Sequence, residues 1–376
     1  MLRNTMHRRS TARRTLLTAT VALLAAACFP IELDVRDGKL LIVRGEGTYV
    51  LDPATGSLTL VRTPDQGPTV FARFSPKGDE VLTVTEKKDG FNDFDFMVGP
   101  TAGGPTRLVY QAKDAGYVRW SPDGALLAVS ELSPDKSKEF DKQMPEIVLV
   151  PSGGGEAAHI LKDTVGTTRW FKDSKRVLAF HATSKLDGVG KTKGDLVVAS
   201  GVKGKPPALA TAIVADGFTA DLSPDESHIV FAAYACAAPG AKLPEADFVT
   251  HLCELDVANG TVRQLDQQAD YALYAPDGQH VLVGSSGSSF STDVAELRVA
   301  DASLNAFTTI AHDSAKSGSG SDAVFPGWID GTTIYYFGVK VTWGSTGKAM
   351  MLYTIGVDGT GRKNLQPAIE TALADQ

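Results

Sequence analysis

The sequence lacks the residue patterns on which several enzyme classes depend. Its seven histidines show no H-x-x-x-H or H-E-x-x-H spacing, and no G-x-S-x-G elbow occurs. Gly188–Thr192 ends like a phosphate-binding loop, but Lys185 stands where the first glycine of that motif belongs. The segment that follows reads as a strand rather than a helix whose N-terminus could hold phosphate. We therefore predict no catalytic residues, no metal site and no cofactor.

Helical patterning and positive charge are also scarce. After residue 30 the apolar residues recur with a spacing of two, which predicts strands and no amphipathic helix. Residues 1–27 hold five arginines, no acid and an uncharged run from Thr15 to Ala27, which is typical of an export signal. Without that segment, 32 basic residues face 44 acidic ones, so we expect no nucleic-acid partner.

What the sequence does contain is a short turn, aromatic-Ser-Pro-Asp-Gly, that recurs seven times ahead of strand-like runs. Proline presets φ and Asp-Gly tolerates positive φ, as a tight link between antiparallel strands requires. The turns lie 40 to 53 residues apart, which is the period of a four-stranded propeller blade. The copies are Val35–Gly38, Phe74–Gly78, Trp120–Gly124, Trp170–Asp173, Leu222–Asp225, Tyr274–Gly278 and Trp328–Gly331.

These turns resemble the repeats of the TolB-like β-propeller family, whose units are also described as WD40-like PD40 repeats. The resemblance implies a propeller, usually in the bacterial envelope, and no shared catalytic residue. Family members usually have six blades, whereas seven turns occur here. We predict an all-β chain with one propeller of four-stranded antiparallel blades, seven in number with six as the alternative. The propeller is expected to span residues 31–368, with 369–376 as a C-terminal tail.

The N-terminal segment also predicts where the protein resides. Leu24–Cys28 resembles a lipoprotein signal, so residues 1–27 would be the signal peptide, Cys28 the lipidated residue and 28–30 a linker. The alternative is a plain cleavage site and a secreted protein. Phe29 rather than Asp follows the cysteine, so we expect the outer membrane rather than the inner one, on its periplasmic side. Arg13-Arg14 fits twin-arginine export, and the general secretory route remains open.

Two further cysteines remain once Cys28 is assigned to lipid. Cys236 and Cys253 would form a disulfide in an oxidising compartment, on adjacent strands of one blade. The alternative is two free buried thiols.

Two sets of residues are candidates for binding. Arg73, Arg119 and Arg169 precede the turn aromatic in three successive repeats, and Asp221 holds that position in the next. These side chains could form an anion-accepting funnel near the channel, or simply pair with neighbouring blades. Three long loops, 133–144, 184–194 and 237–248, would emerge on one face without contributing a strand. Their apolar residues are candidate partner contacts, namely Phe140, Met144, Leu186 and Leu243.

Together these features predict a non-catalytic binding or scaffold lipoprotein of the cell envelope. Its partner would be another envelope protein or polymer, its membrane contact the lipid anchor alone, and its state a monomer. One alternative is a metal-dependent polysaccharide lyase or hydrolase built on a propeller. Another is a sensor of a small anion or ligand that uses the arginines.

Overall fold

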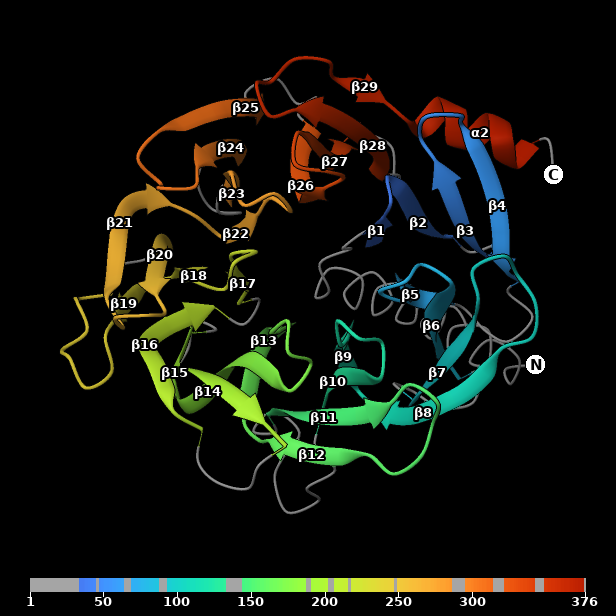
Figure 1. The fold of residues 1–376 in the computed structure, drawn as a ribbon. Coiled ribbons are helices and arrows are strands. Elements are labelled where there is room, and N and C mark those ends of the chain that lie inside the picture. Colours follow the sequence, from blue (N-terminus) through green and yellow to red (C-terminus); the bar gives the residue numbers. More distant parts are fainter. Residues whose placement is uncertain are drawn as a thin grey trace, which may run out of the picture. The chain divides into compact units, whose positions relative to one another are not determined.

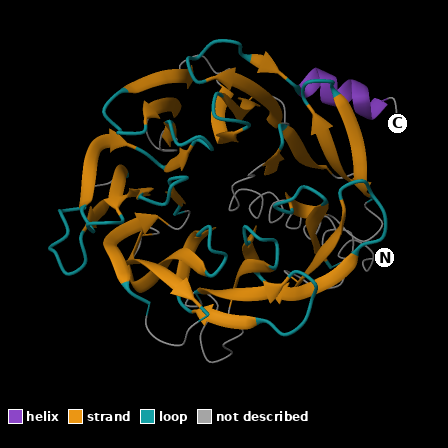
Figure 2. Ribbon diagram, in the orientation of Figure 1, coloured by secondary structure: helices purple, strands orange, loops and turns teal. Residues whose placement is uncertain are grey.

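The computed structural model describes residues 34–374 apart from 45–46, 64–68, 88–92, 133–143, 187–190, 202–205, 216–217, 247–248, 286–294, 314–320 and 342–347. In the unit Leu33–Gln376, seven antiparallel sheets form a ring, with the first strand of each nearest the middle (Figure 1). Nearly every described element is a strand (Figure 2). The predicted seven-bladed propeller of four-stranded blades is therefore confirmed.

The first three blades each use one continuous segment of chain, from inner to outer strand. Blade 1 consists of β1 (Asp34–Arg36), β2 (Lys39–Arg44), β3 (Gly47–Asp52) and β4 (Ser57–Arg62). Blade 2 consists of β5 (Thr69–Phe74), β6 (Glu80–Glu86), β7 (Asp93–Pro100) and β8 (Arg107–Lys113). Blade 3 consists of β9 (Ala115–Trp120), β10 (Leu126–Leu132), β11 (Pro145–Pro151) and β12 (Ala158–Leu161).

The remaining blades follow the same order, with one added strand. Blade 4 consists of β13 (Thr164–Trp170), β14 (Arg176–Leu186), β15 (Lys191–Ser200) and β16 (Ala208–Ala215), and β19 (Ala235–Ala237) pairs with its outer edge. Blade 5 consists of β17 (Ala220–Leu222), β18 (His228–Ala233), β20 (His251–Asp256) and β21 (Val262–Gln268). Blade 6 consists of β22 (Tyr271–Tyr274), β23 (His280–Ser285), β24 (Ala295–Asp301) and β25 (Phe307–Asp313). Blade 7 consists of β26 (Ser321–Trp328), β27 (Thr333–Val341), β28 (Lys348–Gly356) and β29 (Lys363–Asn364).

The Ser-Pro-Asp-Gly turns are held by their own side chains. In blade 3 the Ser121 hydroxyl donates to Asp123 at 2.6 Å and accepts the Leu126 N–H at 2.9 Å. Gly124 takes φ 78°, a conformation that glycine adopts without strain. The serine hydrogen bond is the main cause of the lowered pKa of Asp123. These local bonds fix the angle between the first and second strands of the blade.

Packing between blades supplies the core. The described residues form seven buried apolar clusters, and each cluster draws its members from two neighbouring blades. The second and third strands of the blades, such as β6, β10 and β11, are buried on both faces, so they are mostly apolar along their middle. Two turn tryptophans add polar links. The indole N–H groups of Trp170 and Trp328 donate to the carbonyls of Arg119 and Leu273 in the preceding blade, both at 3.1 Å.

The ring closes without an exchanged strand, because blades 1 and 7 each come from one segment of chain. The seam between them contains Leu40, Tyr335, Leu365 and Ile369, all at most 4% exposed. Ile369 belongs to helix α2 (Gln366–Ala374), which packs beside β4 and β28 (Figure 1). The expectation of no helix after residue 30 is wrong here, and residues assigned to a tail help to close the ring. Among the described residues no helix is long and apolar enough to cross a membrane.

Helix α2 was missed in the sequence because it is short and because one of the two buried apolar residues here, Leu365, lies before the helix while the other, Ile369, lies within it. Its start has clear local causes. The Asn364 side chain accepts the Gln366 N–H at 2.9 Å, and Pro367 follows at a position where a missing N–H costs nothing.

Candidate functional site

The predicted charged set lies on the innermost strands β5, β9, β13 and β17. Arg169 and Asp221 form an ion pair between blades 4 and 5, with 2.7 Å from Nε to Oδ1. The second carboxylate oxygen of Asp221 accepts the backbone N–H of Tyr274 in blade 6, at 2.9 Å. Asp221 therefore connects three blades. Both charged side chains are largely buried, at 14% and 16% exposed.

The other two predicted arginines also contact neighbouring residues of the propeller. Arg73 is only 7% exposed, donates to the Ala72 carbonyl at 3.3 Å and lies 5.8 Å from the centre of the Phe71 ring. Arg119 is half-buried, and its carbonyl accepts the Trp170 indole N–H. Arg169 thus pairs with the neighbouring blade, whereas the contacts described for Arg73 lie within its own blade.

An equivalent acidic position that the sequence analysis missed occurs in blade 1. Asp34 precedes its turn as Asp221 does in blade 5, and its carboxylate accepts the backbone N–H of Phe74 in blade 2. An acid at this position therefore joins its own blade to the next one in two places around the ring. The signal was present in the sequence, because Asp34 stands at the same position of its repeat as Asp221.

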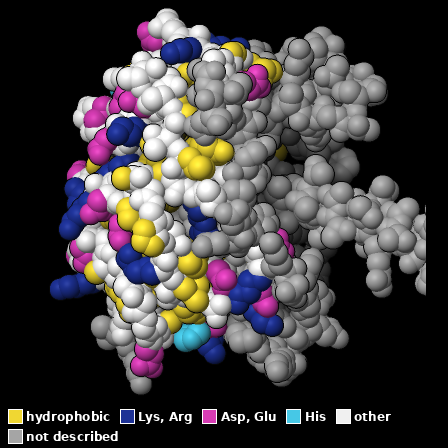
Figure 3. Space-filling view, turned by 90° about the vertical axis from the view of Figure 1, so that its right-hand side faces the viewer, with side chains coloured by type: hydrophobic (Ala, Val, Ile, Leu, Met, Phe, Trp, Pro, Cys, Tyr) yellow, Lys and Arg dark blue, Asp and Glu magenta, His cyan; other side chains and the backbone are white. Residues whose placement is uncertain are grey.

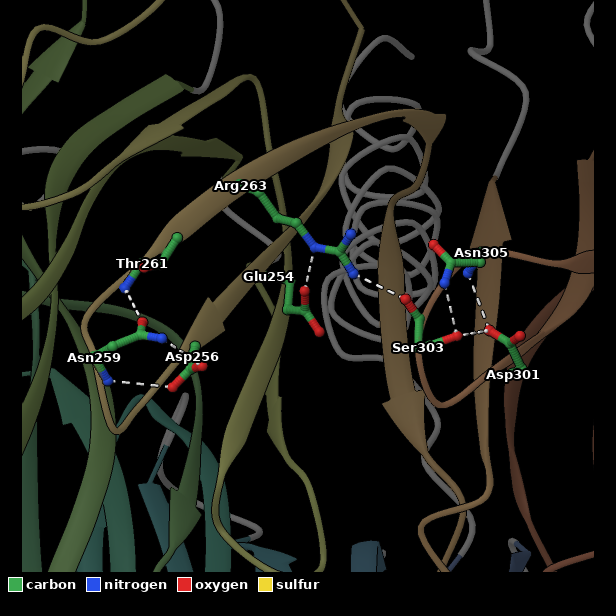
Figure 4. Close-up of polar contacts among 8 residues, drawn as sticks. All are labelled: Glu254, Asp256, Asn259, Thr261, Arg263, Asp301, Ser303 and Asn305. Carbon is green, nitrogen blue, oxygen red and sulfur yellow. Dashed lines mark hydrogen bonds and ion pairs between the residues drawn. The ribbon is translucent and has the colours of Figure 1, made fainter.

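A second repeated clamp lies on the outer strands. Arg263 on β21 pairs with Glu254 of its own blade and donates to the Ser303 carbonyl of blade 6 at 2.9 Å (Figure 4). In blade 2, Arg107 pairs with Glu80 at 2.7 Å and donates to the carbonyl of Ser152 in blade 3 at 3.3 Å. Both arginines stand three residues after the glycine of the preceding turn. That spacing could have revealed the clamp.

Three of the four loop residues predicted as partner contacts lie within the described residues, each in a different environment. Phe140 lies outside the described residues. Met144 packs against the core of blades 4 and 5, so it is a structural residue. Leu186 ends strand β14, where it is the partner of Lys191, and Leu243 is half-buried in the segment before β20.

The segment 184–194 was expected to be a loop without a strand, and that expectation is wrong. Strands β14 and β15 are 11 and 10 residues long and stay paired from Arg176↔Ser200 to Leu186↔Lys191. The hairpin is extended because Lys191, Thr192 and Lys193 are also paired with β16.

The disulfide joins Cys236 and Cys253, with a Cα–Cα distance of 6.6 Å. The prediction that both lie on adjacent strands of one blade is wrong. After β18 the chain leaves blade 5, and β19 pairs with β16 of blade 4, which places Cys236 opposite Ala212. Cys253 stays in β20 of blade 5. The bond therefore crosses the seam between two blades, a fact that only the strand register reveals.

Together these elements form one surface that we call the blade 4–5 ledge. It comprises residues 183–186, 191–194, 211–215 and 234–237. The Lys191 ammonium lies 4.0 Å from the centre of the Tyr234 ring, and the Tyr234 N–H donates to Ile213 at 2.8 Å. Thr183, Ser184 and Lys193 are exposed on it. The ledge is a polar surface on a base held by paired strands and a disulfide.

The face drawn in Figure 3 has mixed charge among its described residues: lysine and arginine side chains are interspersed with aspartate and glutamate, and apolar areas lie between them.

No family model and no curated protein matches this chain. Solved structures that resemble it include a prolyl endopeptidase, with 15% sequence identity and a TM-score of 0.62. That match covers 94% of this chain and 53% of the endopeptidase chain. An oligogalacturonate lyase in complex with manganese matches with 18% sequence identity and a TM-score of 0.58, over 86% of this chain and 88% of the lyase chain. TolB from Acinetobacter baumannii matches with 15% sequence identity and a TM-score of 0.49, over 87% of this chain and 78% of the TolB chain. The chain spans about half the endopeptidase. At such identities the likeness establishes the propeller fold alone.

Proposed function

We propose that this chain is a non-catalytic binding scaffold of the cell envelope, exported and anchored by lipid at Cys28. Its partner is another envelope protein or polymer, which it contacts through the blade 4–5 ledge. The observation that carries this proposal is the ledge itself. It is the place where a blade is extended by a long hairpin, a fifth strand and a disulfide to its neighbour.

Rigid placement of exposed polar groups supports a binding role. A surface that is already ordered loses little conformational entropy when a partner binds. Thr183 and Lys193 lie on paired strands, and the Thr183 hydroxyl donates to the Lys193 carbonyl at 3.2 Å. Leu243 supplies a half-buried apolar residue in the adjoining segment. Polar residues around a few apolar contacts are the usual composition of a non-obligate interface.

The sensor alternative has less support, because Arg169 is already paired with Asp221 and Arg73 is buried. The lyase or hydrolase alternative rests on a likeness of fold alone. Incubation with polygalacturonate and with other polysaccharides would detect such an enzyme by newly formed chain ends. We expect none above the level of a heat-inactivated sample.

Charge reversal on the ledge tests the proposal. The chain, expressed in its own cells with an affinity tag, is captured after mild solubilisation and its co-purifying partners are quantified. Lys193→Glu combined with Thr183→Arg should remove the specific partner. Lys175→Glu is the matched control, because Lys175 is exposed at the opposite end of β14, about 25 Å away at 3.3 Å per residue. Equal loss of the partner in both variants, or in neither, would contradict the ledge as the binding surface.

The anchor is tested separately. Cys28→Ser should abolish incorporation of labelled palmitate and release the protein from the membrane fraction. Incorporation that persists in this variant would exclude Cys28 as the lipidated residue.

A further inference from the structure

Three neighbouring strands of blade 3 bring together two glutamates and a histidine. Glu131 on β10 is the direct partner of Glu146 on β11. His159 on β12 is opposite Val148, two residues beyond Glu146 and on the same face of the sheet. One ligand atom from each side chain lies within 4.8 Å of the other two. The three residues are 15 and 13 positions apart, so no sequence motif announces them.

Burial distinguishes this group from an ordinary acidic patch. Glu131 and Glu146 are 6% and 3% exposed, on the face that packs against blade 2. Among the described residues neither carboxylate pairs with a lysine or an arginine, and the ion-pair partner of Glu146 is His159. Two carboxylates buried side by side need a proton or a cation to offset their repulsion and the loss of water.

The distance between two of the three ligand atoms matches the spacing of ligands around a zinc ion. His159 Nδ1 lies 3.3 Å from Glu146 Oε2. Ligand atoms at 2.0–2.1 Å from a tetrahedral zinc ion are separated from one another by about 3.3 Å. The His159 side chain is 54% exposed, which gives an ion a route from solvent to the two buried oxygens.

We infer that Glu131, Glu146 and His159 bind one divalent transition-metal ion, with Zn²⁺ the best match, at the seam between blades 2 and 3. Imidazole is a ligand that zinc takes readily and that magnesium and calcium do not favour. Three protein ligands leave at least one position for water. This site is independent of the binding function proposed above, because it lies in blade 3 rather than on the ledge.

The neighbouring blade supplies a positioning residue. The Tyr110 hydroxyl on β8 donates to Glu131 Oε1 at 3.0 Å. The tyrosine ring itself is held edge-on against Phe96, with 5.8 Å between ring centres. Hydrogen bonds of this kind orient metal ligands, and their loss typically weakens metal binding about 10–100-fold. Tyr110 thereby links the ion's ligand set in blade 3 to blade 2.

The test measures metal binding by the full mature chain, purified without a histidine tag and freed of metal by chelation. Calorimetric titration with ZnCl₂ should give one site per chain, and Zn²⁺ should bind more tightly than Mn²⁺, as the general order of affinities requires. Saturating Zn²⁺ should raise the midpoint of thermal unfolding. His159→Ala should weaken binding about 100-fold or more, since it removes a ligand, and Tyr110→Phe about 10–100-fold.

His181→Ala is the matched control, because His181 lies on β14 of blade 4, where its Nδ1 is 3.0 Å from the backbone carbonyl of Lys162. It should leave zinc binding unchanged. His159 is exposed, so its variant is expected to fold, and Glu146→Gln provides a second variant at a buried ligand. Absence of stoichiometric zinc binding would overturn the inference and leave the carboxylates sharing a proton. Binding that survives His159→Ala unchanged, or that favours Mn²⁺, would overturn it as well.

Discussion

Replacing Asp221 with alanine tests whether the inner strands are joined by this carboxylate. The change leaves the Arg169 guanidinium without its partner at 2.7 Å and the Tyr274 N–H without its acceptor at 2.9 Å. Breaking a buried ion pair by removing one partner costs about 3–5 kcal/mol. Because the two side chains are 14% and 16% exposed, solvent screens the pair in part. We therefore expect the free energy of unfolding to fall by about 3 kcal/mol, the lower end of that range.

Two further variants separate charge from hydrogen bonding. Asp221→Asn keeps an oxygen for the Tyr274 N–H and should cost less, about 1–2 kcal/mol. In the double variant Arg169→Met, Asp221→Asn, the losses should not add, because the two residues are in direct contact. Asp266→Ala is the control, since Asp266 is exposed on the outer strand β21 of the same blade.

The assay is urea unfolding followed by tryptophan fluorescence. An unfolding midpoint for Asp221→Ala equal to that of the wild type would refute the reasoning. It would mean that solvent replaces the lost contacts, and the funnel interpretation of the four charged residues would then return.

Three other predictions follow from the contacts described. Cys236→Ser with Cys253→Ser should lower the free energy of unfolding by about 3 kcal/mol, from the entropy of a 17-residue loop, and an unchanged urea midpoint would contradict a constraint across the seam. Hydrogen bonds from serine lower the folded-state pKa of Asp123 and Asp225 below the unfolded value, so their contribution to stability is complete above about pH 4 and is lost as the pH falls through the folded pKa. At pH values below about 4, the urea concentration at the unfolding midpoint should fall as the pH falls, and it should fall less steeply in Asp225→Asn. The same pH dependence in wild type and variant would refute the assignment. Ile369→Ala should cost about 2 kcal/mol by opening a cavity at the closing seam, whereas Thr371→Ala, on the exposed side of α2, should cost almost nothing in the same thermal scan.

The sequence predicted the features that are local and failed on those that depend on register. The turns are largely local, since the hydrogen bonds between Ser121, Asp123 and the following strand stay within six residues, although the Asp123 N–H also donates to Ser174 of the next blade. Their number alone indicated seven blades. The disulfide was paired from the cysteine count, but its place across two blades depends on β19 joining β16. No pattern along the chain specifies that pairing.

The candidate site shows the same limit. The repeat position of Arg169 and Asp221 could be read from the sequence, and their pairing was one of two interpretations. Glu131, Glu146 and His159 could not be grouped, because they meet only when three strands of blade 3 align. The long hairpin of blade 4 was mistaken for a loop because Ser184–Gly194 contains three glycines together with Ser184 and Asp187, residue types that are typical of turns.

Site-specific photo-crosslinking in intact cells tests the proposed binding role most directly. A photoreactive amino acid is placed at position 193, on β15 in the blade 4–5 ledge, or at position 175, directly before β14 at the opposite end of the β14–β15 hairpin. Both native lysines are exposed, so neither replacement disturbs the core. The account predicts one dominant crosslinked envelope partner from position 193 and none from position 175. A partner captured from position 175 alone would contradict the account, and so would equal capture from both positions.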